Sequence, residues 1–291
     1  MSEKRLIDRG EAAEASRAAA PGQFVRLSDG LVHYELAGSG DAQTVILVSG
    51  FSVPYPIWDP TFSALVTAGF QVLRYDLYGR GYSDRPDTIY DQDLFDRQLA
   101  NLIDALRIKT PVDLVGLSLG GAIAIVFTDR HPEWVRRLGL IDPAGLPWKA
   151  SLPARISKAP LLGELIMALL GNRVLLSNLS DYLYGEARYD ELKRQFIQQL
   201  QFAGFKRALL STLRNGAISG AEAAYRRVGV RGTPTILFWG REDRVVPFEL
   251  SERVMQLIPN AEFHAIANAA HVPHFECPEV VNPLLIDFLT R

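Results

Sequence analysis

The sequence is poor in cysteine, in net charge and in long hydrophobic runs. Cys277 is the one cysteine among 291 residues, so an internal disulfide framework and a cysteine-rich zinc site are excluded, and a reducing, cytoplasmic location is expected. A formal net charge of -2 provides no positive field for a phosphate backbone, so nucleic acid is not an expected partner. The longest apolar stretch, residues 159–176, contains an acid, an asparagine and an arginine, and is too polar to cross a bilayer.

The composition is that of a globular protein with enough apolar surface for a core. Hydrophobic residues make up 48% and charged residues 22% of the chain, which excludes a disordered, collagenous or coiled-coil protein. Residues 1–22 begin with charged side chains and continue into an alanine-rich polar stretch, without the apolar run of a signal peptide. We expect this segment to be a tail or a peripheral helix.

Short apolar runs alternate along the chain with amphipathic stretches. The predicted strands are residues 24–27, 31–36, 44–49, 71–77, 112–117, 137–141, 235–239 and 262–267. The predicted helices are residues 58–68, 91–106, 119–130, 249–257 and 278–289. Runs that are apolar throughout are typical of strands covered on both faces. Repeated strand, helix, strand units predict right-handed crossovers and a mostly parallel α/β sheet with helices on both faces.

The alternation stops between about residues 145 and 215, where consecutive helical segments follow one another without a convincing strand. We interpret this stretch as a lid inserted between two strands of the sheet. The predicted organisation is therefore a tail at residues 1–22, an α/β core at residues 23–144 and 216–291, and a helical lid at residues 145–215.

A serine lies at the centre of a glycine-rich pentapeptide. Gly116, Ser118 and Gly120 form the pattern G-x-S-x-G directly after a predicted strand and directly before a predicted helix. A strand that turns straight into a helix strains its central residue, and larger side chains two positions away would collide. We interpret Ser118 as a nucleophile; the alternative is a glycine-rich turn in which Ser118 caps the helix.

A serine hydroxyl needs a base to accept its proton, and five histidines are candidates: His33, His131, His264, His271 and His274. The first two lie far from the serine in this arrangement, and His264 lies within a predicted strand. His271, in the loop after the last strand, is the preferred base. His274 competes with it, although its position near the final helix favours a solvated or capping role. A metal site at these last two histidines would lack further clustered ligands.

The imidazole needs an anion that holds its tautomer and stabilises its protonated form. Asp243 lies in the loop after a predicted strand that precedes the histidine strand, and the chain order serine, aspartate, histidine is that of α/β-hydrolases. Asp142 and Glu242 are the rivals. The alternative for Asp243 is a turn residue paired with Arg241 or Arg244.

Residues 76–84 contain two glycines, but they have neither spacing of a nucleotide-binding loop. Nucleotide binding is therefore not supported. We interpret Asp76 and Ser83 as turn residues that hydrogen-bond to the backbone.

Five motifs together resemble the α/β-hydrolase fold family. They are residues 49–51, 76–84, 116–121, 239–247 and 271–276, in that order along the chain. The resemblance covers residues 24–291 apart from the predicted lid. It implies an eight-stranded sheet, a serine nucleophile and a lid that shapes the substrate pocket.

The resemblance also implies an oxyanion hole made of two backbone amides, those of Phe51 and Leu119. Removing one such donor typically costs about 3 kcal/mol of transition-state stabilisation. Ser49 stands where the family usually has a histidine before the loop glycine. The amides would be unaffected by this change, while the loop geometry would differ.

Serine at the elbow argues for acyl transfer, because dehalogenases and epoxide hydrolases of this fold carry aspartate there. Carbon–carbon hydrolases of the meta-cleavage type often have asparagine before the serine and tryptophan after the histidine, whereas this chain has Leu117 and Val272. We therefore expect a lipase-like serine carboxylesterase that acts on a small-molecule ester with a hydrophobic acyl or alcohol group. The alternatives are a meta-cleavage carbon–carbon hydrolase, a cofactor-free perhydrolase and a non-enzymatic ligand receptor.

The expected reaction needs no metal and no organic cofactor, and the protein is expected to be a monomer or a homodimer. The predicted lid contains ten lysines and arginines and five acids. Its leucines repeat at helical spacing, which favours packing against the core. The alternative is weak contact of this basic, amphipathic cover with an anionic lipid surface.

Overall fold

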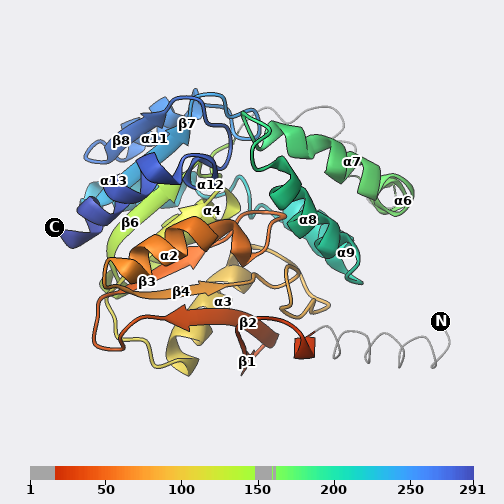
Figure 1. The fold of residues 1–291 in the computed structure, drawn as a ribbon, viewed down its shortest axis with the longest axis horizontal. Helices are drawn as coiled ribbons and strands as arrows, with labels where there is room; N and C mark the ends of the chain where they lie inside the picture. Colours follow the sequence, from red (N-terminus) through yellow and green to blue (C-terminus); the bar gives the residue numbers. More distant parts are fainter. Residues whose placement is uncertain (1–16, 148–158, 160–161) are drawn as a thin grey trace.

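The computed structural model describes residues 17–147, 159 and 162–291, and its centre is an eight-stranded sheet (Figure 1). The strands are β1 (Gln23–Leu27), β2 (Gly30–Ala37), β3 (Thr44–Val48), β4 (Gln71–Tyr75), β5 (Val112–Leu117), β6 (Val135–Ile141), β7 (Thr235–Gly240) and β8 (Glu262–Ile266). Their order across the sheet is β1-β2-β4-β3-β5-β6-β7-β8. Every strand expected from the sequence is present, with ends shifted by at most two residues.

Among the described strands, β2 alone runs opposite to the others. β1 pairs antiparallel with β2, and β2 with β4, while β4, β3, β5, β6, β7 and β8 are all parallel to one another. The carboxyl ends of these parallel strands therefore lie at one edge of the sheet, where loops from several strands can combine into one site.

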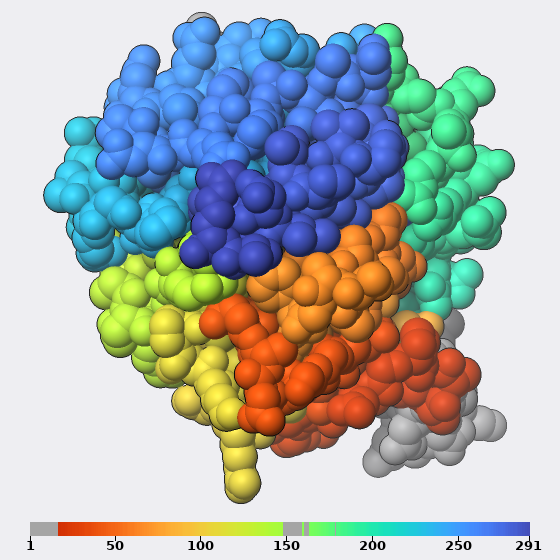
Figure 2. All heavy atoms as spheres, turned by 60° about the vertical axis from the view of Figure 1, so that its left-hand side comes forward, coloured from red at the N-terminus to blue at the C-terminus, as the bar shows by residue number. Residues whose placement is uncertain are grey.

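Helices cover both faces of the sheet. On one face lie α2 (Asp59–Thr67) and α13 (Pro278–Thr290), which are in contact and lie side by side in Figures 1 and 2. The other face carries α3 (Gln92–Ala105), α4 (Leu119–Arg130), α10 (Glu222–Arg231) and α11 (Leu250–Leu257). The described residues also include the short segments η1 (Tyr55–Trp58), η2 (Pro132–Trp134) and α12 (Pro273–Glu276).

Side chains of the central strands alternate between two hydrophobic clusters, one on each face. In β3, Ile46 and Val48 pack with α3 and α4, whereas Val45 and Leu47 pack with α2 and α13. All four are fully buried. This two-residue period on doubly covered strands explains why the sequence shows continuous apolar runs instead of alternating polarity.

Between β6 and β7 the described residues form helices joined by turns and loops, and they include no strand. The helical segments before α10 are α6 (Leu162–Leu169), α7 (Gly171–Ser177), η3 (Asn178–Asp181), α8 (Tyr189–Leu200) and α9 (Phe205–Arg214), seen beside the sheet in Figure 1. We call α6–α9 the insertion. Leu192 and Phe196 of α8 pack into the cluster under α2 and α13, so the insertion rests on the core. Residues 148–158, 160 and 161 of the predicted lid lie outside the described residues.

Helix α10 was not expected from the sequence. It contains Gly229 and buries only Ala224, Tyr225 and Val228, so its apolar pattern is weak. The glycine is required by packing, because a Cβ at this position would lie 1.9 Å from the carbonyl oxygen of Leu257 in α11. No helix among the described residues is both long and apolar enough to span a membrane.

The amino-terminal segment is anchored where the structure describes it, from Arg17 onward. The Arg17 guanidinium donates to the carbonyl of Tyr82 at 3.0 Å and to the carboxylate of Asp84 at 2.5 Å. The rest of the predicted tail, residues 1–16, lies outside the described residues.

The expected turn roles of Asp76 and Ser83 are confirmed. The Asp76 carboxylate accepts the backbone N–H groups of Tyr55 and Tyr82, at 2.9 and 3.0 Å. The Ser83 hydroxyl donates to the Asp76 carbonyl at 2.7 Å.

Candidate active site

Ser118 lies between the end of β5 and the start of α4 in a strained backbone conformation. Its φ is 54° and its ψ is -117°, a region that non-glycine residues rarely occupy. The flanking glycines make this turn possible, because a Cβ at Gly116 would lie 2.2 Å from the Gly120 carbonyl oxygen, and one at Gly120 would lie 2.1 Å from that of Val48. The Ser118 side chain makes no capping hydrogen bond to α4, so the capping alternative is not supported.

His271 and Asp243 form a buried hydrogen-bonded pair. The His271 Nδ1 and Asp243 Oδ2 atoms are 2.8 Å apart, and the exposed fractions of the two residues are 1% and 6%. The other carboxylate oxygen, Oδ1, accepts the backbone N–H groups of Val245 and Val246 at 2.7 and 3.0 Å. These two donors hold the Asp243 carboxylate in place, and the carboxylate can then orient the His271 imidazole.

The alternative pairing of Asp243 with arginine is absent from the described part of the chain. Neither Arg241 nor Arg244 forms an ion pair with it. Glu242, one rival for the acid, instead accepts the N–H of Ala269 at 3.2 Å.

The loop that carries His271 folds back over the end of β7. A Cβ at Gly240, the last residue of β7, would lie 1.9 Å from the Ala270 carbonyl oxygen, and the Glu242 N–H donates to the Ala269 carbonyl at 3.1 Å. The loop thereby brings the histidine toward the β5 side of the sheet, where Ser118 lies. Among the described residues no hydrogen bond joins Ser118 Oγ to His271 Nε2. Such bonds often shorten only when substrate binds.

The two amides assigned to the oxyanion hole are free of backbone partners. Neither the Phe51 nor the Leu119 N–H donates to a backbone carbonyl elsewhere in residues 17–147, 159 and 162–291. Leu119 is the first residue of α4, so its N–H lies at the positive end of the helix dipole. The loop that contains Phe51 lies against the serine, since a Cβ at Gly50 would be 3.6 Å from the Ser118 Cβ.

Arg80 holds the carbonyl side of this loop. Its side chain is fully buried and donates to the carbonyl of Phe51 at 2.8 Å, to that of Tyr78 at 3.0 Å, and to the hydroxyl of Thr212 in α9 at 2.9 Å. Burial lowers the pKa of Arg80 to about 9. Its partners are neutral oxygens, so the side chain links the loop to the insertion without a salt bridge in the described structure.

Tyr182 connects the insertion to both sides of the site. Its carbonyl accepts the His271 N–H at 3.1 Å, and its ring meets the imidazole edge-on at 5.3 Å between centroids. Its hydroxyl is 3.1 Å from the Ser52 hydroxyl in the loop after β3. Glu276 adds a second link, because its carboxylate accepts the N–H of Ala270 at 2.7 Å and that of Tyr184 at 2.6 Å. Burial raises the pKa of Glu276.

No local sequence pattern indicated the contacts of Tyr182 and Arg80, because each contact joins residues more than twenty positions apart. Glu276 belonged to a motif, but its partners could not be read from the pattern.

The other histidines are engaged elsewhere. His33 pairs with Asp76 at 2.7 Å, His131 lies near Asp96 at 3.4 Å, and His264 pairs with Glu262 at 2.9 Å. His274, the competitor for the base, is fully buried. Its ring centroid lies 4.3 Å from that of Trp58. Burial lowers its pKa to about 3, so this imidazole stays neutral and is not the solvated or capping group expected from the sequence.

The polar atoms of Asp142, Asp243 and His271 lie within 4.8 Å of one another, which raises the question of a metal site. A tetrahedral zinc ion with ligands at about 2.1 Å would separate its ligand atoms by about 3.4 Å. The 2.8 Å separation of His271 Nδ1 and Asp243 Oδ2 fits a direct hydrogen bond better.

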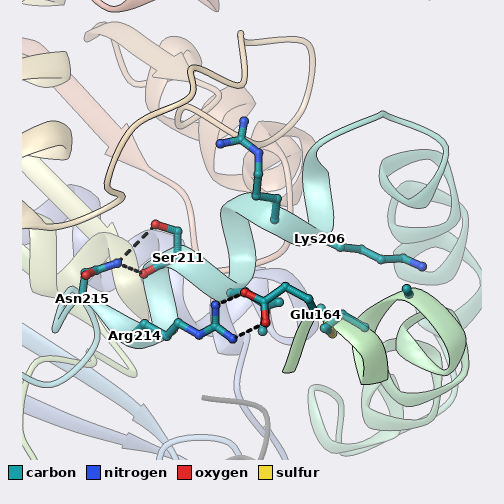
Figure 3. Close-up of a pocket in the computed structure, with 9 residues that line it drawn as sticks. Glu164, Lys206, Ser211, Arg214 and Asn215 are labelled. Atoms are coloured by element: carbon teal, nitrogen blue, oxygen red, sulfur yellow. Dashed lines mark hydrogen bonds and ion pairs between the residues drawn. The ribbon is translucent and has the colours of Figure 1, made fainter. Parts of the chain in front are cut away.

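A cavity of about 440 Å³ lies within the insertion, between α6 and α9 (Figure 3). Its lining residues are Glu164, Met167, Ala168, Lys206, Arg207, Leu210, Ser211, Arg214 and Asn215. Arg214 faces Glu164 across it as a charge pair. None of the three candidate catalytic residues lines the cavity. Two of its lining residues, Met167 and Leu210, also belong to a small cluster that packs against Phe51.

The elbow, the buried His–Asp pair and the parallel sheet occur together with a family match. The model of the alpha/beta hydrolase family matches residues 45–284. The chain belongs to the alpha/beta hydrolase family. The eight-stranded sheet expected from the resemblance is thereby confirmed.

Curated proteins similar to this chain include two hydrolases. The chain is 31% identical to a 2-hydroxymuconate semialdehyde hydrolase of Pseudomonas putida, over 88% of this chain and 90% of the relative. It is 29% identical to a 2-hydroxy-6-oxo-6-phenylhexa-2,4-dienoate hydrolase of Comamonas testosteroni, over 91% and 93% of the two chains.

A solved structure points the same way. A meta-cleavage product hydrolase from Pseudomonas fluorescens IP01 is 26% identical and superposes with a TM-score of 0.75 over 92% of this chain and 97% of that one. These comparisons support a hydrolase, and they favour the carbon–carbon alternative over the ester hydrolase that the sequence led us to expect.

Proposed function

We propose that this alpha/beta hydrolase cleaves a carbon–carbon bond in a conjugated oxo acid of the meta-cleavage type. The observation that carries the proposal is the set of similar proteins named as hydrolases of conjugated oxo compounds or of a meta-cleavage product, which match this chain over most of its length. Two features of the site support it: Ser118 occupies a strained turn between β5 and α4, and His271 forms a buried hydrogen bond with Asp243, as a nucleophile and its base–acid pair would.

The proposed reaction starts with attack of Ser118 Oγ on the oxo carbon of the substrate while His271 takes the hydroxyl proton. The resulting oxyanion is stabilised by the N–H groups of Phe51 and Leu119. Attack takes place on the keto tautomer, in which the enol proton of the substrate has moved to the carbon next to the oxo group. When the carbon–carbon bond breaks, its electron pair is delocalised into the unsaturated 2-oxo acid as a dienolate, and the proton of the imidazolium completes the dienol product. Water, deprotonated by His271, then releases the acid from the acylated Ser118. Asp243 orients the imidazole in every step.

Ester hydrolysis is the second candidate. Leu117 and Val272, which flank the serine and the histidine, are buried in an apolar cluster and offer no polar group to a carbanionic leaving group. An alkoxide is a better leaving group than a carbanion, and it needs less assistance. The steps at Ser118, His271 and Asp243 would otherwise be the same.

The two candidates are separated by comparing substrates with the purified protein. The oxo acids named for the relatives lose their conjugated absorbance when the bond breaks, and p-nitrophenyl esters of increasing chain length release a coloured phenolate. We expect kcat/KM for one of the oxo acids to exceed that for the best ester by about a hundredfold or more. Ester turnover at ordinary enzyme rates without oxo-acid cleavage would overturn the proposal and favour the esterase.

The insertion is proposed to act as a lid over this site, since it contacts the oxyanion loop through Arg80 and the histidine loop through Tyr182. Contact of the insertion with anionic lipid stays a prediction, as does the monomeric or dimeric state. The prediction of lipid contact is motivated by three leucines in and just after α6 that are more than half exposed: Leu165, Leu169 and Leu170.

A further inference from the structure

Asp142 was a rival for the triad acid, and the structure places it directly beside that acid. It follows β6, which lies between the serine strand β5 and the Asp243 strand β7. The residue is fully buried, with a φ of 41°. Ser118, Asp142, Asp243 and His271 thus follow four successive strands of the sheet.

The two carboxyl groups differ in the hydrogen bonds they receive. Asp243 accepts three N–H donors, from Val245, Val246 and His271. Asp142 accepts one, the N–H of Gly240, which is 2.9 Å from Oδ1. Its second oxygen, Oδ2, is buried and receives no donor from any described residue.

Polar atoms of Asp142 and Asp243 lie within 4.8 Å of each other. Ionisation of both buried carboxyl groups at this distance is unfavourable, because each negative charge destabilises the other. The proton belongs on the group with fewer donors, which is Asp142. A proton on Oδ2 also removes the unsatisfied position, because an O–H group there can donate to the carboxyl of Asp243, which lies within 4.8 Å of a polar atom of Asp142.

We propose that Asp142 is held as a neutral carboxylic acid whose Oδ2–H donates to Asp243, so that the acid of the triad is a pair of carboxyl groups that share one proton. Asp142 is then a positioning residue. It keeps Asp243 aligned on His271 without adding a second negative charge, and the pair carries a net charge of about -1.

The electrostatics of the surroundings agree with this assignment. Burial and the adjacent Asp243 raise the pKa of Asp142 well above its usual range, and the more distant Glu276 adds to the effect. His271 is the cationic partner when protonated, and it faces Asp243 rather than Asp142 in the hydrogen-bond pattern.

The test uses Asp142→Asn, because an amide has the shape and hydrogen-bond pattern of a protonated carboxyl. Its oxygen can accept the Gly240 N–H while its NH₂ donates to Asp243. We expect the rate of fluorophosphonate labelling at Ser118, and its pH profile, to stay within about threefold of the unmodified protein. Asp142→Leu, which lacks the donor, should lower that rate by about tenfold or more. Labelling does not depend on the natural substrate, so this outcome is separate from that of the proposed function.

Infrared difference spectroscopy gives the second readout and needs no destabilised variant. A neutral carboxyl shows a C=O stretch that a carboxylate lacks, and we expect this band at pH 8 in the unmodified protein and its loss in Asp142→Asn. Absence of the band at pH 8 would overturn the proposal. So would a loss of labelling in Asp142→Asn as large as that in Asp243→Asn, because Asp142 would then act as an anion.

Discussion

At the residue scale, the site depends on one strained backbone position. Ser118 adopts a positive φ at the end of β5, and Cβ atoms at Gly116 and Gly120 would collide with backbone carbonyl oxygens. Strain of this kind typically costs about 1–3 kcal/mol and persists because the surrounding sheet and helix hold it. The protein therefore gives up stability to hold Ser118, the proposed nucleophile, in this conformation.

This trade predicts opposite effects of two substitutions at Ser118 on stability. Ser118→Gly should raise the free energy of unfolding by about 1 kcal/mol, because glycine adopts positive φ without a Cβ clash, whereas Ser118→Ala should not. Both should lower kcat by about 10⁴-fold or more, because the nucleophile is lost. Urea titration measures the free energy of unfolding, and turnover assays measure kcat. Substitution of an exposed serine of α2, Ser63→Ala, is the control. Equal stability of the glycine and alanine variants would mean that the turn stores no strain.

At the element scale, the insertion is tied to the core by a few polar contacts around the site. Arg80 connects the loop after β3 to Thr212 in α9, and Tyr182 connects Ser52 to the histidine loop. Each contact joins segments that are distant in the chain. Movement of the insertion would therefore shift both the loop that contains Phe51 and the loop that contains His271.

The contact between Arg80 and Thr212 can be removed without changing shape. Thr212→Val leaves a buried guanidinium N–H without its acceptor, and a hydrogen bond to a charged group contributes about 1.5–3 kcal/mol. We expect a loss of about 2 kcal/mol in the free energy of unfolding. Thr212→Ser keeps the hydroxyl and is the matched control. If the valine variant is as stable as the serine variant in chemical denaturation, Arg80 does not rely on this contact.

At the scale of the whole molecule, burial of His274 in the core determines how the stability of the fold responds to acid. The core is built of two apolar clusters, and one of them surrounds the neutral His274 near Trp58. Between the two pKa values, this buried imidazole stays neutral in the folded protein, whereas the same side chain binds a proton in the unfolded chain. The fold must therefore lose stability as the pH falls below the ordinary histidine pKa.

The expected loss follows from the two pKa values of His274, about 3 in the folded protein and near 6.5 in the unfolded chain. Its contribution to stability is complete above pH 6.5 and declines by about 1.4 kcal/mol per pH unit between pH 6.5 and 3. His274→Phe keeps a ring against Trp58 and removes the titration. The free energy of unfolding, measured by denaturant titration, should fall between pH 7 and pH 5 by about 2 kcal/mol less in the variant than in the unmodified protein. The same acid sensitivity in both proteins would contradict this account of His274.

The sequence by itself predicted the succession of strands and most of the covering helices, the turn at Ser118, and His271 and Asp243 as the candidate base and acid. These features have local signatures, since strand runs, amphipathic periods and glycine spacing are all read over a few neighbouring residues. Tertiary structure alone decided that the loop after β8 folds over Gly240, that Asp142 meets Asp243, and that Arg80 and Tyr182 reach the insertion. Those contacts join distant segments whose side chains meet only when the packed sheet brings their strand ends to one edge.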